Sequence, residues 1–111
     1  MLYFEPTEMN TADCTVRFTA KDGDTEYGSC DLLLHDQVAD LVSCALSVPD
    51  PIIGEGLFRA ALHYAANRGY YIGVCSAPQA DAVRARLAFL EKDGRWCNDI
   101  PTLLTGHCCE N

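Results

Sequence analysis

Two glycines near the start of a predicted helix are the residues with the clearest chemical meaning. Gly54 and Gly56 flank Glu55 and follow the turn Val48-Pro49-Asp50. Glycine lets the backbone approach a phosphate closely, and the free amides and dipole of a helix N-terminus attract anions. Gly54 and Gly56 could therefore let a phosphate group approach the backbone. The alternative is that the glycines only allow another element to pack closely.

A second group of side chains with ligand chemistry lies near the C-terminus. Cys97, His107, Cys108 and Cys109 carry the sulfur and nitrogen ligands that zinc prefers, and together they could complete a tetrahedral site. The adjacent pair Cys108-Cys109 lacks the CxxC spacing that brings two thiolates together. The alternatives are a redox-active pair of neighbouring thiols or a tail without chemistry.

A cysteine activated by a histidine is the third chemistry to consider. Cys75 is the best placed of the seven cysteines, because it is predicted at the C-terminal end of a strand just before a helix, where thiolates are stabilised. His35 and His63 are candidate bases, but no Cys/His pair has a diagnostic spacing. The alternative is that Cys75 is a buried structural residue.

The glycine pair is positioned by a helix with clear boundaries. Asp50 suits the N-cap and Pro51 the first helical position, while Gly69 is expected to end the helix. The predicted buried stripe comprises Leu57, Phe58, Ala61, Leu62, Tyr64 and Ala65.

A buried strand and a second helix are predicted to follow. Residues 70–75 form a charge-free run typical of a strand covered on both faces. Ser76 and Gln79 predict a capping box for a helix that ends at Gly94. Its expected buried stripe is Ala80, Val83, Leu87 and Leu90.

Three strands are predicted before the first helix, at residues 15–21, 26–34 and 40–47. Short turns join them, so an antiparallel meander is expected. The predicted fold class is α/β: a single domain in which a mixed sheet, the meander plus one parallel strand, is packed by two main helices. We place this domain at residues 13–96, between an N-terminal extension (1–12) and a cysteine-rich tail (97–111).

Size and charge limit the classes of partner. A chain of 111 residues, 49% of them hydrophobic, supports one domain. The net charge of -8 argues against binding nucleic acid or an anionic membrane surface. No secretion signal and no apolar run of about 20 residues are present, so a cytoplasmic protein with reduced cysteines is expected.

The order strand, helix, strand, helix and the glycine pair resemble the cofactor-binding half of the GCN5-related N-acetyltransferases. In that family a strand ending in Val, Pro and an acidic residue leads into a Gln/Arg-x-x-Gly-x-Gly/Ala loop that holds the pyrophosphate of coenzyme A. Val48-Pro49-Asp50 and Gly54-x-Gly56 are similar to the two ends of this pattern, with Pro51 in place of the Gln or Arg. The run from Phe89 to Gly94 is similar to the family's Phe-Tyr-Glu-Lys-Leu-Gly, with Leu90 in place of a Tyr that protonates the leaving thiolate.

This resemblance, which covers residues 15 to 96, implies an acyl-CoA-dependent N-acyltransferase. Acetyl-CoA is then the expected cofactor, a small amine or a peptide is the expected acceptor, and the resemblance implies Val48, Gly54, Glu55 and Gly56 as the cofactor-binding residues. The catalytic residues stay unassigned, although Tyr64, Tyr70 or Tyr71 could replace the missing acid. The alternatives are a non-catalytic binding or assembly module on the same fold, expected to be a homodimer, and a metal- or redox-responsive protein that uses the cysteines and histidines.

Overall fold

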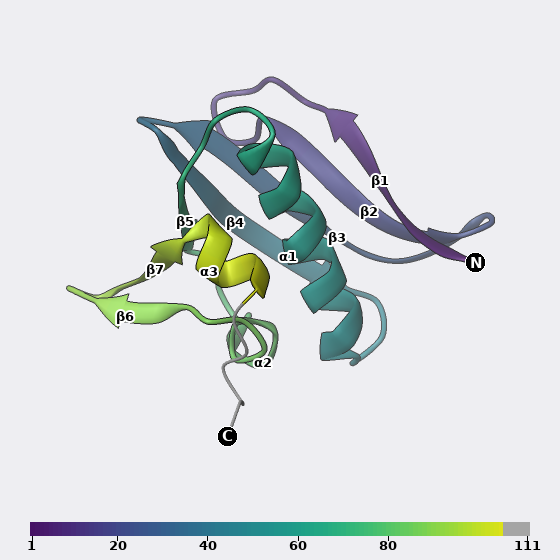
Figure 1. Cartoon of the computed structure of the whole chain (residues 1–111). Coiled ribbons are helices and arrows are strands. Elements are labelled where there is room, and N and C mark those ends of the chain that lie inside the picture. The colour runs from purple at the N-terminus through teal and green to yellow at the C-terminus, as the bar shows by residue number, and fades with distance from the viewer. Residues whose placement is uncertain (106–111) are drawn as a thin grey trace.

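One mixed sheet extends through the molecule in the computed structural model, which describes residues 1–105 (Figure 1). Its seven strands are β1 (Leu2–Glu8), β2 (Val16–Asp22), β3 (Thr25–His35), β4 (Val38–Leu46), β5 (Ile72–Cys75), β6 (Leu90–Lys92) and β7 (Arg95–Asp99), in the order β1-β2-β3-β4-β5-β7-β6. β4 and β5 are parallel and the other neighbours are antiparallel. The predicted fold class, an antiparallel meander with one added parallel strand, is confirmed.

The meander forms where the alternation of apolar and polar residues predicts it. In β2, Val16 and Phe18 are buried while Arg17 and Thr19 are half-exposed. Successive side chains of a strand point to opposite faces, so one face of the sheet is apolar and the other polar. β3 and β4 continue these two faces.

The first residues of the chain belong to the same sheet. β1 pairs antiparallel with β2 along its whole length, from Leu2 opposite Asp22 to Glu8 opposite Val16. Residues 1–12, expected from the sequence to be an N-terminal extension, thus contribute a strand, although β1 shows no alternating burial and contains Pro6. A proline is tolerated here because β1 is an edge strand, where an N–H that faces solvent is not needed for pairing.

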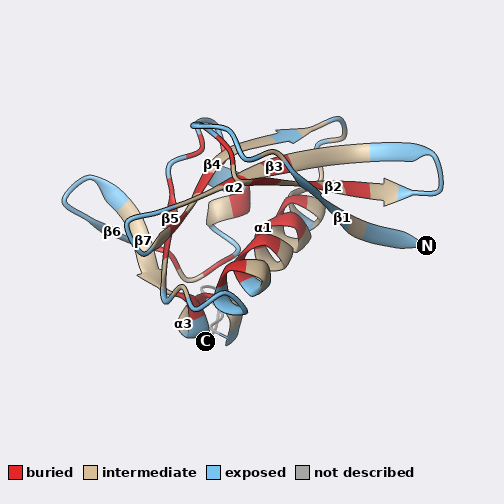
Figure 2. Ribbon diagram, turned by 90° about the horizontal axis from the view of Figure 1, so that it is seen from above, coloured by how far each residue is buried: buried red, intermediate tan, exposed pale blue. Residues whose placement is uncertain are grey.

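The helix α1 (Pro51–Ala66) begins and ends as predicted. Asp50 is its N-cap, with Pro51 in the first turn, and Gly69 follows its end with a φ of 89°. Leu57, Phe58, Ala61, Leu62 and Ala65 are buried, as predicted, while Tyr64 is half-buried. α1 lies with α3 (Ile100–Thr105) against the apolar face of the sheet (Figure 2).

The prediction of a long second helix ending at Gly94 is wrong. α2 comprises only Asp81–Arg84, and no side chain caps it. Gln79 has a φ of 58°, which the predicted capping box does not allow. After a turn at residues 85–88, β6 and β7 form a hairpin, because Asp93 and Gly94 have φ values of 55° and 79° that suit a tight type I′ turn.

Residues 97–105, placed from the sequence in a cysteine-rich tail outside the domain, form part of β7 and all of α3 in the structure. β7 pairs with β5, and α3 buries Ile100 and Leu103 in the core. His107, Cys108 and Cys109 lie outside the described residues. Between residues 1 and 105, the helices are too short or too polar to cross a membrane.

Candidate functional site

The candidate site is a crevice that opens where β4 and β5 separate. The two strands pair from Val38 opposite Ile72 to Leu41 opposite Cys75. A last hydrogen bond joins them where Ser76 N donates to Leu41 O at 3.0 Å. Beyond this point β4 continues to Leu46, and within residues 1–105 it pairs with a strand only on its β3 side.

A β-bulge marks the point of separation. Asp31 pairs with Ser43 and Leu32 pairs with Leu41, so Val42 is an extra residue in β4. A bulge disrupts the hydrogen-bonding ladder and bends its strand, and such bulges are over-represented beside active sites. The bend and the end of β5 together keep the second half of β4 open toward the crevice.

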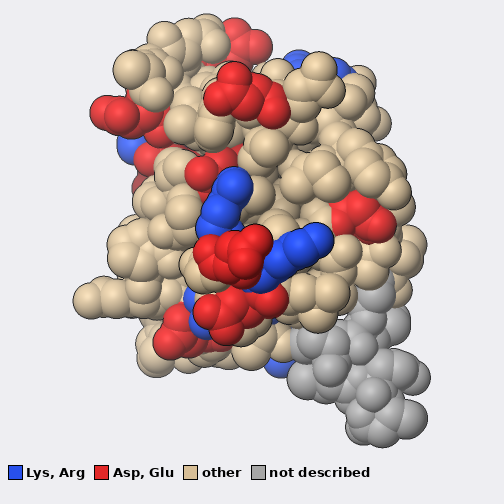
Figure 3. Space-filling view, turned by 90° about the vertical axis from the view of Figure 1, so that its left-hand side faces the viewer, with Lys and Arg blue, Asp and Glu red and all other residues tan. Residues whose placement is uncertain are grey.

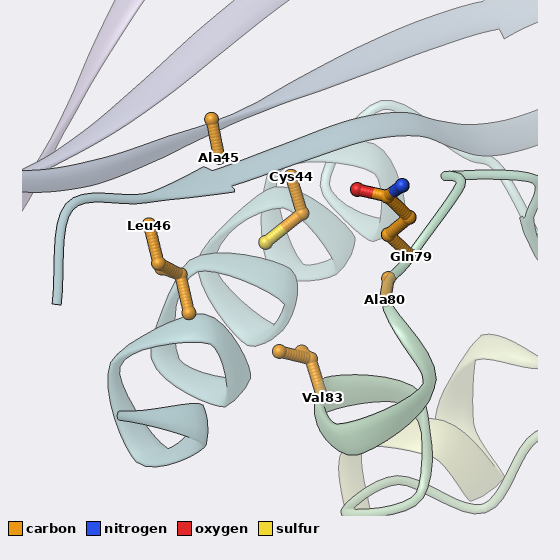
Figure 4. Close-up of a pocket in the computed structure, with 6 residues that line it drawn as sticks. All are labelled: Cys44, Ala45, Leu46, Gln79, Ala80 and Val83. Carbon is orange, nitrogen blue, oxygen red and sulfur yellow. The ribbon is translucent and has the colours of Figure 1, made fainter. Parts of the chain in front are cut away.

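A pocket of about 390 Å³ fills the opening. One wall comes from β4 (Cys44, Ala45 and Leu46), and the other comes from the segment before α2 (Gln79 and Ala80) and from Val83 of α2 (Figure 4). The side chains of Leu46 and Val83 are apolar, and the side-chain amide of Gln79 extends toward β4 (Figure 4). The pocket therefore suits a slender ligand with both apolar and amide groups.

The thiol that lines this pocket is not a ready nucleophile. Burial, assisted by the neighbouring Cys75, raises the pKa of Cys44 to about 11. Burial also raises the pKa of Cys75, which lies in the hydrophobic core and is 4% exposed. Both thiols keep their protons near neutral pH, so the structure favours the structural role of Cys75 over the nucleophilic one.

The backbone donors of the first turn of α1 already have partners. The N–H of Ile52 donates to Asp50 Oδ1 at 3.0 Å, and the N–H of Ile53 donates to Asp50 O at 3.1 Å. Pro51 has no N–H to offer. Val48 is half-buried in the preceding turn, where its carbonyl accepts from the N–H of Asp50 at 2.8 Å. The amides that could bind a phosphate are thus used to cap the helix.

The two glycines of the sequence motif lie in α1, with other elements packed against them. A Cβ built at Gly54 would overlap a methyl group of Val83, and one built at Gly56 would overlap the ring of Phe4. Gly54 is fully buried and Gly56 is half-buried. The structure therefore supplies a packing reason for both residues, which was the alternative considered from the sequence.

Glu55, between the glycines, is neutralised by two arginines. Its Oε1 accepts from Arg86 Nε at 2.6 Å and its Oε2 from Arg59 Nε at 2.9 Å. Burial acts to raise the pKa of Glu55, but the hydrogen bonds and charges of Arg86 and Arg59 outweigh it and hold the pKa below its usual value. Glu55 thus links α1 to the segment after α2.

A polar cluster lies beside the last β4–β5 hydrogen bond, on the sheet face opposite α1 and outside the lining of the pocket. Asp40 Oδ1 accepts from Ser76 Oγ at 2.7 Å, and Asp40 Oδ2 lies 4.0 Å from His35 Nε2. Asp40 points away from α1 because its neighbours Ala39 and Leu41 are buried in the core. Its side chain is only 16% exposed. We call Asp40, Ser76 and His35 the Asp40 cluster.

Asp40 and Ser76 are not among the functional residues predicted from the sequence. The available signal was a single carboxylate within the apolar run Val38-Ala39-Asp40-Leu41-Val42. This carboxylate can be assigned to a polar cluster only from the structure, because the end of β5 brings Ser76 beside it.

The tyrosines proposed as replacements for a missing acid do not lie at the pocket. Tyr64 packs edge-on against Phe18, with ring centroids 5.6 Å apart. Tyr70 and Tyr71 precede β5, at the end opposite the crevice. Leu90, at the expected position of the acid, is exposed on β6.

The proposed zinc ligands can be followed only in part. Cys97 is half-buried in β7, opposite Val74 and Leu90, and the other three ligands fall outside the described residues. Within residues 1–105, His, Cys, Asp and Glu side chains do not gather in a group of three that could hold a metal ion. The zinc site stays a prediction.

Two solved structures share this architecture. Escherichia coli YhhK, assigned as an N-acetyl transferase and solved bound to coenzyme A, has a TM-score of 0.62 and 14% identity, over 86% of this chain and 79% of that one. A Bacillus subtilis acetyltransferase in complex with CoA has a TM-score of 0.58 and 17% identity, over 89% of this chain and 94% of that one. No family model and no curated protein matches the sequence.

Proposed function

Because the chain has the fold of the GCN5-related N-acetyltransferases, we propose that it binds an acyl thioester such as acetyl-CoA in the crevice and transfers the acyl group to an amine. The observation that carries this proposal is the separation of β4 from β5 at the bulge at Val42, which opens the 390 Å³ pocket. In this family a pantetheine arm inserts between the corresponding strands.

The pocket fits the arm of such a donor. Within residues 1–105 the second half of β4 has no partner strand on the side of the crevice, and an extended ligand can pair with such a strand through its own amides. The apolar walls from Leu46 and Val83 suit the methylene and methyl groups of pantetheine, and Gln79 offers an amide. Bound acetyl-CoA would supply an activated acyl group, and a backbone N–H at the bulge around Val42 would be the group to polarise its carbonyl.

The Asp40 cluster is placed to receive the amine. A partly buried carboxylate attracts a cationic amine, and the net charge of -8 favours the approach of cations over anions. Asp40 would orient the acceptor while the imidazole of His35, the usual base near neutral pH, takes the proton that the amine loses. The acceptor then approaches from the sheet face opposite α1.

The lack of a tyrosine at Leu90 is compatible with this chemistry. A thiol has an ordinary pKa of about 8.5, so a thiolate can leave without being protonated in the same step. Catalysis then depends on holding the two reactants together and polarising the thioester.

The proposal is tested first by donor binding. Cys44→Phe should fill the crevice and weaken acetyl-CoA binding about tenfold or more, whereas Cys44→Ala, which leaves the crevice open, should keep the affinity. Isothermal titration calorimetry measures both, and the thermal unfolding of each variant checks its fold. Equal affinities for the two variants, or no binding of acetyl-CoA by the wild type at millimolar concentration, would refute a donor site in the crevice.

Transfer is tested with a panel of diamines and lysine-containing peptides, by following thiol release from acetyl-CoA. Asp40→Asn should lower kcat/KM about 100-fold while the Kd for acetyl-CoA is unchanged. Asp24→Asn, in the exposed β2–β3 turn, makes the same charge change and should have no effect. Donor binding without transfer to any amine would favour the non-catalytic binding module.

A further inference from the structure

The N-terminus of α1 in this chain is closed to the phosphates of a nucleotide. Its first-turn N–H groups are bound by the side chain and carbonyl of Asp50, and Pro51 has none. A pyrophosphate placed there would have to displace a cap and would meet the carboxylate of Asp50. Removing a good N-cap costs about 1 kcal/mol of stability, so a phosphate that displaced Asp50 from the first-turn amides would bind against this cost.

The glycines do not provide a second route. In a phosphate-binding loop, the missing side chain leaves room for the ligand. Here the space beside Gly54 is filled by Val83 and the space beside Gly56 by Phe4 from β1. Each glycine therefore accommodates a hydrophobic side chain.

The nearest basic groups are already engaged by other side chains. Arg59 and Arg86 both bind Glu55, and Arg59 also donates to Leu104 O at 2.8 Å. Arg84 pairs with Asp81 at 2.9 Å and stacks on Trp96, with Cζ 4.2 Å from the ring centroid. On the side of the molecule shown in Figure 3, acidic and basic side chains are interspersed and the basic ones form no continuous patch.

The groups that line the crevice are uncharged. Three features can hold an amide-containing chain without any charge on the ligand: the edge of β4 that lacks a partner strand within residues 1–105, the amide of Gln79 and the apolar side chains of the walls. We infer that the acyl donor is recognised through its pantetheine arm, and that the nucleotide of coenzyme A contributes little to its affinity. This inference rests on the proposed function. Pantetheine thioesters are then donors whether the arm ends in a nucleotide, in a phosphate or on a carrier.

The experiment compares donors with and without the nucleotide. The affinities of the full chain for acetyl-CoA and for S-acetylpantetheine are measured by calorimetry, with adenosine 3′,5′-bisphosphate as a competitor. We expect the two donors to bind within about threefold of each other and the bisphosphate not to compete. A preference for acetyl-CoA of about tenfold or more would overturn this inference while the proposed function stands. If neither donor binds, the proposed function fails and the inference fails with it.

Salt and one matched pair of variants sharpen the comparison. A pyrophosphate held by fixed positive groups would bind more weakly as salt rises, whereas here added salt should leave acetyl-CoA binding unchanged or strengthen it by screening repulsion.

Asp50→Asn keeps a good N-cap and removes the charge, so it should strengthen acetyl-CoA binding but not S-acetylpantetheine binding. Asp93→Asn, in the β6–β7 turn, makes the same charge change and should alter neither. Salt that weakens acetyl-CoA binding, or an Asp50→Asn effect on both donors, would contradict the inference.

Discussion

Replacing Gly54 by alanine tests whether this glycine is needed for packing. The new methyl group would overlap Val83, which is 4% exposed and has a stiff β-branched side chain. Overpacking a core typically costs about 1 to 3 kcal/mol, while alanine improves helix propensity by about 1 kcal/mol. The expected net effect of Gly54→Ala is therefore a loss of about 1 kcal/mol in the free energy of unfolding.

The same substitution should have the opposite sign once Val83 is shortened. A Val83→Ala background removes both methyl groups and leaves only the Cβ of residue 83, at 3.3 Å, so Gly54→Ala should stabilise the protein by up to about 1 kcal/mol through helix propensity. The coupling energy between the two positions is then about 2 kcal/mol. Urea unfolding followed by circular dichroism gives all four free energies, because a single domain of this size usually unfolds in two states.

A neighbouring glycine provides the matched control. Gly56→Ala should also destabilise the protein, but through Phe4, so Val83→Ala should not rescue it. If Gly54→Ala has the same effect in both backgrounds, or if Val83→Ala rescues both glycine variants equally, the packing explanation for Gly54 is wrong.

Three further results are expected. The folded-state pKa of Glu55 is depressed, so its ion pairs stabilise the protein above the unfolded-state pKa, and this contribution is lost as pH falls through the folded-state pKa. Glu55→Gln should therefore cost about 1 to 2 kcal/mol in urea unfolding at pH 7 and nothing at a pH where the Glu55 carboxyl is protonated in both the folded and the unfolded state. A difference that stays constant across pH would exclude this linkage. Asp50→Ala should lower the free energy of unfolding by about 1 kcal/mol while Asp50→Ser should not, and equal losses in urea unfolding would show that the cap is not the cause. Mass mapping after iodoacetamide treatment near neutral pH should find Cys44 and Cys75 unmodified in the native protein, since both thiols have raised pKa values, and rapid alkylation of Cys75 would restore it as a candidate nucleophile.

Local signals in the sequence were sufficient for the meander and the first helix. Val16 and Phe18 alternate with polar residues, and Asp50, Pro51 and Gly69 mark the helix boundaries through capping chemistry that involves only nearby residues. The same kind of reasoning failed after Cys75. There, an amphipathic stripe suggested a helix, but the Asp93-Gly94 turn signal that favours a hairpin was read only as the stop of that helix.

Which residues come together at the site, in contrast, is decided by the tertiary structure. Sequence determined that Gly54 and Gly56 open a helix, that the chain is acidic, and that its fold resembles an acyltransferase. It did not determine what fills the space beside those glycines, because Val83 and Phe4 come from distant segments. Nor did it bring Ser76 beside Asp40, since that contact exists only because β5 ends where β4 bends. Capping and periodicity act between neighbours in the chain, whereas a crevice depends on how strands from different parts of the chain meet and separate.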